Sequence, residues 1–219
     1  MSTDLEVVDD PAAVARRGAE VIAERARSTV DARGAFAIAV SGGGTPVPMF
    51  EALGEYDLPW EAISIYQVDE RIAPPGNDDR NLTHLMDALP EPARRRVNPM
   101  PVEAAEVSAA AAEYAASLPE FDLIHLGIGP DGHTASLVPG DPVLDVTDRK
   151  VATTGEYQGR RRMTLTYPPI DSAAEILWII AGGDKRDPVQ KLLKHDPSVP
   201  AGRVANDRML VVADRAAAG

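Results

Sequence analysis

Cysteine is absent from this sequence of 219 residues. Its absence excludes disulfide bonds, thiolate catalysis and zinc sites built on cysteine, but it does not identify a cellular compartment. The sequence contains 4 histidines, and no two of them have the spacing of metal ligands. The sequence therefore predicts a protein without a metal site.

An excess of positive charge is also absent. Lysine and arginine number 22 against 34 aspartate and glutamate residues, which gives a formal net charge of −12. Nucleic acids and anionic membranes need a basic surface, so this balance argues against both as partners. An anionic small molecule would have to be held by a few local cations and by backbone amides.

Long apolar runs are missing as well. No stretch reaches the roughly 18 consecutive apolar residues that span a bilayer. Residues 1–6 have neither a basic start nor an apolar run, so we expect no secretory signal and a cytoplasmic protein. No shift in composition and no internal repeat divides the chain. Its length suits one α/β domain, and we expect a single domain over residues 1–219.

Predicted helices and strands alternate along the chain. Apolar side chains recur at helical spacing in residues 11 to about 30 and in residues 103–118. Residues 35–40 form an apolar run without alternation, which is typical of a strand buried on both faces of a parallel sheet. Further strands are expected at residues 62–68, 122–128, 162–167, 175–181 and 209–214. Threonines alternate with apolar residues in 162–167, which indicates one more polar face. This order predicts an α/β fold, a Rossmann-like doubly wound and mostly parallel sheet with helices on both faces.

Four polar or glycine-rich clusters follow predicted strands, at residues 41–45, 69–71, 129–133 and 182–185. Parallel strands bring their carboxyl ends to one edge of a sheet, where ligands bind near a switch in strand order. We therefore expect these clusters to form one active site.

The first cluster, Ser41-Gly42-Gly43-Gly44-Thr45, lies between a strand and a predicted helix. Its glycines leave successive N–H groups open to an oxyanion, and a helix N-terminus adds further donors. Thr45 is expected to cap that helix, with Pro46 at its first position. The alternative is an ordinary tight turn. The cluster lacks the Gly-Lys-Ser/Thr ending of a P-loop and the Gly-x-Gly-x-x-Gly spacing of dinucleotide folds, so a nucleotide is not indicated.

The third cluster contains Asp131-Gly132-His133. Imidazole titrates near neutrality and can take a proton from water, while a nearby carboxylate orients the ring. The alternative is a helix start that Asp131 merely caps. His125 lies inside an apolar strand and is expected to be a core residue, and His84 and His195 lie in unremarkable stretches.

Arg71, Arg162 and Lys185 are the cations best placed to hold an anionic ligand. Surface ion pairs are the alternative for each of them. Asp69 and Glu70 are interpreted either as acid–base groups or as counter-charges of Arg71.

Several collinear motifs carry a resemblance to a known family. They are residues 41–46 (SGGGTP), 68–71 (VDER), 126–140 (LGIGPDGHTASLVPG), 162–166 (RMTLT) and 181–185 (AGGDK), with Pro200-Ala201 and Asp214 near the end. With these motifs the sequence resembles the 6-phosphogluconolactonases, within the larger group that includes glucosamine-6-phosphate deaminases and ribose-5-phosphate isomerases. The resemblance implies hydrolysis of 6-phospho-D-glucono-1,5-lactone in the oxidative pentose phosphate pathway, without metal or organic cofactor. The expected partner is a small sugar phosphate, and the expected state is a monomer or a small homo-oligomer.

The resemblance also implies residue roles. It identifies His133 as the general base, and Asp131 and Arg71 complete the expected catalytic group. The expected ligand-binding residues are Gly42, Gly43, Gly44, Thr45, Asp69, Asn81, Arg162 and Lys185. The phosphate would dock on the glycine loop with help from Arg162 or Lys185. Arg71 or a backbone N–H would stabilise the oxyanion.

Departures from the family pattern mark three positions. Arg80 stands where a serine is common, Val138 replaces an aromatic residue, and Val212 replaces a tryptophan. Two rival functions remain. A glucosamine-6-phosphate deaminase needs an acid in an Asn-Glu-Pro-Gly segment, which residues 136–140 (SLVPG) lack. A non-catalytic sugar-phosphate sensor is disfavoured, because no helix-turn-helix segment or basic arm is present.

Overall fold

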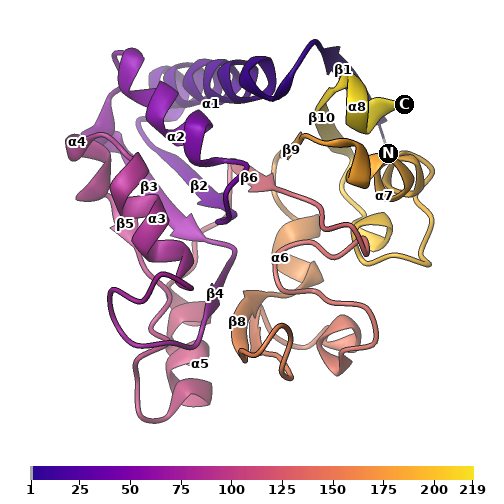
Figure 1. Ribbon diagram of the computed structural model, residues 1–219. Coiled ribbons are helices and arrows are strands. Elements are labelled where there is room, and N and C mark those ends of the chain that lie inside the picture. Colours follow the sequence, from indigo (N-terminus) through magenta and orange to yellow (C-terminus); the bar gives the residue numbers. More distant parts are fainter. Residues whose placement is uncertain (1) are drawn as a thin grey trace.

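The computed structural model describes residues 2–219. A seven-stranded sheet, parallel throughout, has the strand order β1-β10-β9-β6-β2-β3-β5. Its strands are β1 (Ser2–Val8), β2 (Phe36–Val40), β3 (Ile63–Gln67), β5 (Val97–Asn98), β6 (Leu123–Leu126), β9 (Ile176–Ile180) and β10 (Arg208–Asp214). The expected α/β fold with a mostly parallel sheet is confirmed (Figure 1).

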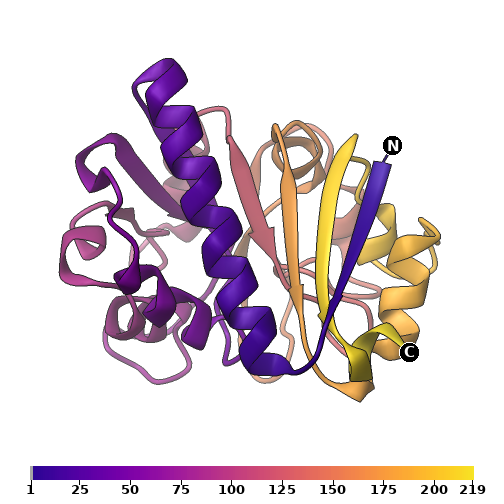
Figure 2. The same ribbon diagram turned by 90° about the horizontal axis from the view of Figure 1, so that it is seen from above.

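Helices cover both faces of this sheet. One face carries α1 (Pro11–Arg33), α2 (Val47–Ala52), α3 (Asn81–Ala88) and α4 (Glu91–Arg94), and the other carries α5 (Val107–Ser117), α6 (Tyr167–Asp171), α7 (Arg186–Leu193) and α8 (Arg215–Ala218). Figure 2 shows α1 lying across the strands. Asp10 caps this helix by accepting from Ala13 N at 2.7 Å, and Gly34 ends it with a φ of 79°.

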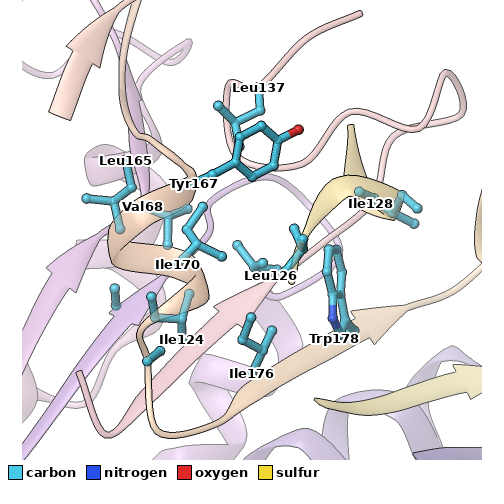
Figure 3. Close-up of a cluster of buried hydrophobic side chains, with 14 of the residues drawn as sticks. Val68, Ile124, Leu126, Ile128, Leu137, Leu165, Tyr167, Ile170, Ile176 and Trp178 are labelled. Carbon is cyan, nitrogen blue, oxygen red and sulfur yellow. The ribbon is translucent and has the colours of Figure 1, made fainter. Parts of the chain in front are cut away.

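The buried strands divide their side chains between two hydrophobic clusters. In β9, Leu177 and Ile179 pack on the side of α1, whereas Ile176 and Trp178 belong to the cluster on the opposite face. Figure 3 shows this second cluster, where Ile170 of α6 lies over the sheet. Full burial of one such side chain is worth roughly 1.5–3 kcal/mol. Apolar side chains on both faces explain why these strands read as continuous apolar runs.

A second, three-stranded sheet was not expected. It is antiparallel, with the order β4-β8-β7, and consists of β4 (Asp69–Arg71), β8 (Arg162–Leu165) and β7 (Val151–Thr153). The polar cluster at 69–71 is thus itself a strand. The alternation expected in residues 162–167 is present, although all of β8 is buried. Met163 and Leu165 belong to the hydrophobic core, and Arg162 lines the site described below.

Val68 joins the two sheets. Its N–H donates to Val40 O of the large sheet at 3.0 Å, and its carbonyl accepts from Leu165 N of the small sheet at 2.7 Å. The residue is fully buried. The backbone of one residue therefore fixes the distance between the two sheets.

Some local predictions were wrong. Helix α2 begins at Val47, with Pro46 at the cap position and no side-chain hydrogen bond that caps it. The expected capping by Thr45 therefore does not occur. Helix α5 begins at Val107, because residues 103–106 form turns. Strands β1, β5 and β7 were not predicted. Within residues 2–219, none of the helices is both long enough and apolar enough to cross a bilayer.

Strand β2 lies between β3 and β6, so the strand order reverses beside it. The loops after β2 and β6 leave the sheet at this switch point. Those after β3 and β9 leave the same edge, because all these strands are parallel. The expected convergence of the four clusters on one edge is thereby confirmed.

Candidate active site

A pocket of about 210 Å³ opens at the carboxyl edge of the large sheet. It is lined by side chains and backbone from all four clusters and from the small sheet. The predicted site residues on its wall are Gly42, Gly43, Gly44, Thr45, Asp69, Arg71, Asn81, His133, Arg162 and Lys185. Among the predicted residues, Asp131 is the one that does not line the pocket, and it contacts His133 instead.

The loop after β6 presents His133 to the pocket. Gly129 N donates to His133 O at 2.8 Å, and Gly132 adopts a φ of 80°. The His133 Nδ1 atom lies 2.6 Å from Asp131 Oδ1, and the backbone N–H of His133 donates to the same oxygen at 3.2 Å. No helix begins here, so the alternative of Asp131 as a helix cap is excluded.

The Asp131 carboxylate determines which nitrogen of His133 is protonated. Burial alone would raise the pKa of Asp131, but its hydrogen bonds from His133 and Tyr157 outweigh burial and lower the pKa. An ionised Asp131 can only accept a proton donor, so Nδ1 of His133 carries the hydrogen. In the neutral imidazole the lone pair is then on Nε2, the nitrogen that Asp131 does not contact.

The glycine loop packs tightly against the start of α3. A Cβ atom on Gly42 would lie 2.3 Å from the Asn81 side chain, so this position requires glycine. Gly43 has a φ of 95°, whereas Gly44 has open space beside it. The hydroxyl of Ser41, which also lines the pocket, has no hydrogen-bond partner among the described residues.

Arg71 and Arg162 stand directly opposite each other on the antiparallel strands β4 and β8. The Nε atom of each is buried without a hydrogen-bond partner in the described part of the chain. Arg71 donates to Asp79 O at 2.8 Å. Burial lowers the pKa of Arg162; the charge of Asp69 opposes this shift, and that of Arg71 adds a smaller contribution to it. Two guanidinium groups thus stand side by side, each with one N–H group that has no partner among the described residues.

Asp69 organises the wall between these groups. Its Oδ1 accepts from Asn81 Nδ2 at 3.1 Å, and its Oδ2 accepts from Ser136 Oγ at 2.6 Å. The carboxylate therefore connects β4, the start of α3 and the loop after His133. The Oδ1 atom of Asn81 remains without a partner among residues 2–219.

Glu70 points away from the pocket and caps α3. Its carboxylate accepts from Asn81 N and from Leu82 N, each at 2.8 Å. Arg80 is only 2% exposed, lies 3.5 Å from Glu70 Oε2 and pairs with Glu103. The interpretation of Glu70 as an acid–base group is therefore wrong. Arg80 forms ion pairs with Glu70 and Glu103 and does not line the pocket.

Lys185 reaches the pocket from the turn after β9. Its Nζ lies 2.9 Å from Asp184 Oδ2, and its side chain is 17% exposed. Asp214 at the end of β10 accepts from Gly182 N at 3.1 Å and so holds this turn. Lys185 therefore lies at the pocket wall as one half of an ion pair with Asp184.

His125 is a core residue, as expected. Burial lowers its pKa to about 3, so the ring is neutral. It accepts from Ser41 N at 3.3 Å and packs edge-on against Phe50. Within residues 2–219, no group of three acidic or histidine side chains is arranged to hold a metal ion.

Tyr157 was missed by the sequence analysis. Its hydroxyl donates to Asp131 Oδ2 at 3.0 Å, and its ring lies edge-to-face with that of His133. Ser136 was missed too, although it lies in the motif that follows His133. No spacing in the sequence connects Tyr157 with Asp131, because a hairpin brings them together.

Comparison with known proteins agrees with this geometry. Residues 9–212 match the model of the family described as glucosamine-6-phosphate isomerases/6-phosphogluconolactonase. A 6-phosphogluconolactonase of Nostoc is 34% identical over 85% of this chain and 83% of its own. The crystal structure of a 6-phosphogluconolactonase from Shewanella baltica superposes with a TM-score of 0.87 at 25% identity, covering 97% of this chain and 98% of that one.

The same fold is found in a monomeric glucosamine-6-phosphate deaminase, with a TM-score of 0.81, 20% identity and coverage of 98% of both chains. The fold alone therefore does not separate the two activities. The resemblance inferred from the motifs is confirmed by the family model and by the curated relatives. The chain is an enzyme of the glucosamine-6-phosphate isomerase/6-phosphogluconolactonase family.

Proposed function

We propose that this enzyme is a lactone hydrolase that converts 6-phospho-D-glucono-1,5-lactone to 6-phospho-D-gluconate in the oxidative pentose phosphate pathway. The names of the relatives support this substrate. The observation that carries the proposal is that one pocket combines a His133–Asp131 couple with two opposed arginines, whose Nε atoms have no partner among the described residues. A base and an anion site are the two elements that hydrolysis of a phosphorylated lactone requires.

In the proposed mechanism, neutral His133 acts through Nε2. This atom takes a proton from water, and the water oxygen attacks the carbonyl carbon of the lactone. The resulting tetrahedral oxyanion collapses, the bond between the carbonyl carbon and the ring oxygen breaks, and the imidazolium returns its proton to that oxygen. The new carboxylic acid loses its proton to solvent. Asp131 holds the Nδ1–H tautomer and stabilises the imidazolium.

Binding and charge stabilisation are assigned to the remaining wall residues. The phosphate docks on Gly42, Gly43, Gly44 and Thr45, with Arg162 or Lys185 as its cation. Arg71 or a backbone N–H stabilises the oxyanion. Asp69 and Asn81 contact the sugar hydroxyls. The Asp69 carboxylate can accept hydrogen bonds from these hydroxyls, and the Asn81 amide can both donate and accept them. The mechanism uses no metal and no organic cofactor.

The deaminase alternative lacks its acid. The acid of the deaminase segment Asn-Glu-Pro-Gly directly precedes Pro-Gly, and in this chain Val138 stands directly before Pro139 and Gly140. Release of ammonia from glucosamine 6-phosphate, followed in a coupled assay, tests this alternative directly. We expect no release above background.

His133→Ala provides the main test of the proposed function. General base catalysis is worth about 10²–10⁴-fold, so the catalysed rate should fall by that factor. Product binding should persist, because the anion site is untouched. A variant that hydrolyses the lactone at the wild-type rate would exclude His133 as the base. Tight 6-phosphogluconate binding by a wild-type protein that gives no acceleration would instead identify a sensor.

A further inference from the structure

Tyr157 has no role in the mechanism above, yet it contacts both functional halves of the pocket. Its hydroxyl donates to Asp131 Oδ2 at 3.0 Å and lies 3.5 Å from His133 Nδ1. The ring meets that of His133 edge-to-face, with the centroids 5.4 Å apart. One tyrosine thus contacts both members of the proposed catalytic pair, Asp131 and His133.

The other side of the same ring supports Arg162. The guanidinium carbon lies 4.9 Å from the ring centroid, a distance at which cation–π attraction is effective. The Nη2 atom of Arg162 donates to Tyr157 O at 3.4 Å and to Gln158 Oε1 at 3.3 Å. These contacts leave the unpartnered Nε for a ligand.

The hairpin between β7 and β8 holds Tyr157 in place. Gln158 and Gly159 have φ values of 53° and 77°, and Tyr157 pairs with Arg160 across this two-residue turn. Arg160 donates to Asp79 Oδ2 at 2.9 and 2.7 Å. Because Asp79 O also accepts from Arg71, the hairpin is tied to the opposite wall of the pocket.

We propose that Tyr157 is a positioning residue, whose hydroxyl orients Asp131 and through it His133, and whose ring holds Arg162 in its ligand-binding orientation. This inference rests on the proposed function. Asp131 uses Oδ1 for His133 and Oδ2 for Tyr157, so the plane of its carboxylate is fixed at both oxygens. Without the hydroxyl, Oδ2 of the 37% exposed Asp131 side chain turns to water.

Tyr157 is suited to act as a permanent donor. Burial raises the pKa of its hydroxyl, and the hydrogen bond to Asp131 raises it further. The phenol therefore stays protonated at neutral pH and continues to donate to the carboxylate.

Two substitutions separate the roles of the hydroxyl and the ring. Tyr157→Phe should lower kcat about tenfold and leave KM within about twofold, since only a hydrogen bond to a charged group is lost. Tyr157→Leu should show the same loss in kcat and raise KM about fivefold, because Arg162 loses its support.

Tyr56 provides matched controls, since Arg27 lies 5.8 Å from its ring centroid and the residue is absent from the pocket wall. Tyr56→Phe and Tyr56→Leu should leave both constants unchanged.

A readout without substrate keeps this inference separate from the proposed function. Nitrogen-15 NMR of the full chain should show His133 as the Nδ1–H tautomer, with a larger share of Nε2–H in Tyr157→Phe. This change in the tautomer ratio does not depend on catalysis. If the wild type failed to hydrolyse the lactone, only the proposed function would be refuted. Wild-type kcat and an unchanged tautomer ratio in a folded Tyr157→Phe variant would overturn the role of the hydroxyl. An unchanged KM in Tyr157→Leu would overturn that of the ring.

Discussion

Arg71 of β4 and Arg162 of β8 are direct cross-strand neighbours, and the Nε atom of each is buried without a partner among the described residues. Like charges placed opposite each other destabilise a sheet. In this protein the opposed pair faces a pocket, so a bound anion would remove the repulsion. We propose that the pair serves ligand binding, and that the charge of Asp69 offsets the repulsion on Arg162 in the free enzyme.

Replacement of Arg162 should separate stability from binding. We expect Arg162→Met to weaken 6-phosphogluconate binding by about 10- to 100-fold, the worth of one or two charge-assisted hydrogen bonds. Its free energy of unfolding without ligand should stay within about 1 kcal/mol of wild type, because the repulsion by Arg71 and the attraction by Asp69 are removed together. Calorimetric titration and urea unfolding measure the two quantities.

Arg149 is the matched control for this experiment. It is 61% exposed, pairs with Asp148 and lies outside the pocket wall. Arg149→Met should retain wild-type affinity for the product. Equal losses of affinity in both variants would contradict a specific anion site at Arg162.

Gly129 should tolerate no side chain. A Cβ atom there would lie 2.1 Å from both Cε1 and Nδ1 of His133, so Gly129→Ala must displace the imidazole. Misplacement of a base by about 1 Å costs about 10²-fold in rate, and we expect kcat to fall by at least that factor. Gly54→Ala is the control, since the nearest atom to its Cβ is Pro90 Cβ at 3.7 Å. Steady-state kinetics with unchanged circular dichroism would establish the effect. A fully active Gly129→Ala would show that His133 is not held as described.

Asp131 should give the folded state a pH-dependent contribution to stability. Burial opposes ionisation, but the hydrogen bonds from His133 and Tyr157 outweigh it and hold the pKa below the unfolded value of 3.8. A lowered folded-state pKa stabilises the fold above the unfolded pKa, and this contribution is lost as the pH falls through the folded value. The side chain is 37% exposed, so solvent screening limits the effect to less than about 1 kcal/mol.

Urea unfolding of wild type and Asp131→Asn tests this contribution. The wild type should be the more stable protein at about pH 6, and the difference should shrink as the pH falls to about 2.5, because Asp131 then takes up a proton in the unfolded and, at lower pH, in the folded wild type. A difference that is the same at both pH values would assign the effect to packing.

Arg80 should matter for stability and not for phosphate binding. It is buried between Glu70, which is fully buried, and Glu103. Arg80→Ala leaves the Glu70 charge without its cation, which should lower the free energy of unfolding by about 3–5 kcal/mol. Arg95→Ala removes an exposed arginine paired with Glu91 and should cost less than about 0.5 kcal/mol. Loss of product affinity in a folded Arg80 variant, such as Arg80→Lys, would contradict this assignment.

Local patterns in the sequence were sufficient to predict much of the fold and the pocket wall. The strands that end in Val40 and Leu126 are apolar on both faces, and the loops after them carry the glycines and His133. Such information is contained in a few consecutive residues. Parallel topology then brings the loops together without any knowledge of tertiary contacts.

The features that were missed depend on long-range pairing. Strand β1 contains Asp4 and Glu6 and lies at the sheet edge, so it lacks the apolar run of a central strand. The small sheet is visible only once β4 and β8 are paired. The contact of Tyr157 with Asp131 likewise arises from a hairpin whose position depends on that sheet. The expected cap at Thr45 was wrong because the helix starts later, at Val47.

The bonds of Val68 to both sheets bear on how fast a substrate can enter. The proposed base, His133, lies on the loop after β6 of the large sheet, and the opposed arginines lie on the small sheet, so any movement between the sheets would change their separation. The two backbone hydrogen bonds of buried Val68 tie the sheets together within the core. We therefore expect the pocket to have its binding geometry before the substrate arrives. The association rate of the substrate should then be limited by diffusion and by repulsion between the anionic substrate and the net charge of the protein, not by a closing motion.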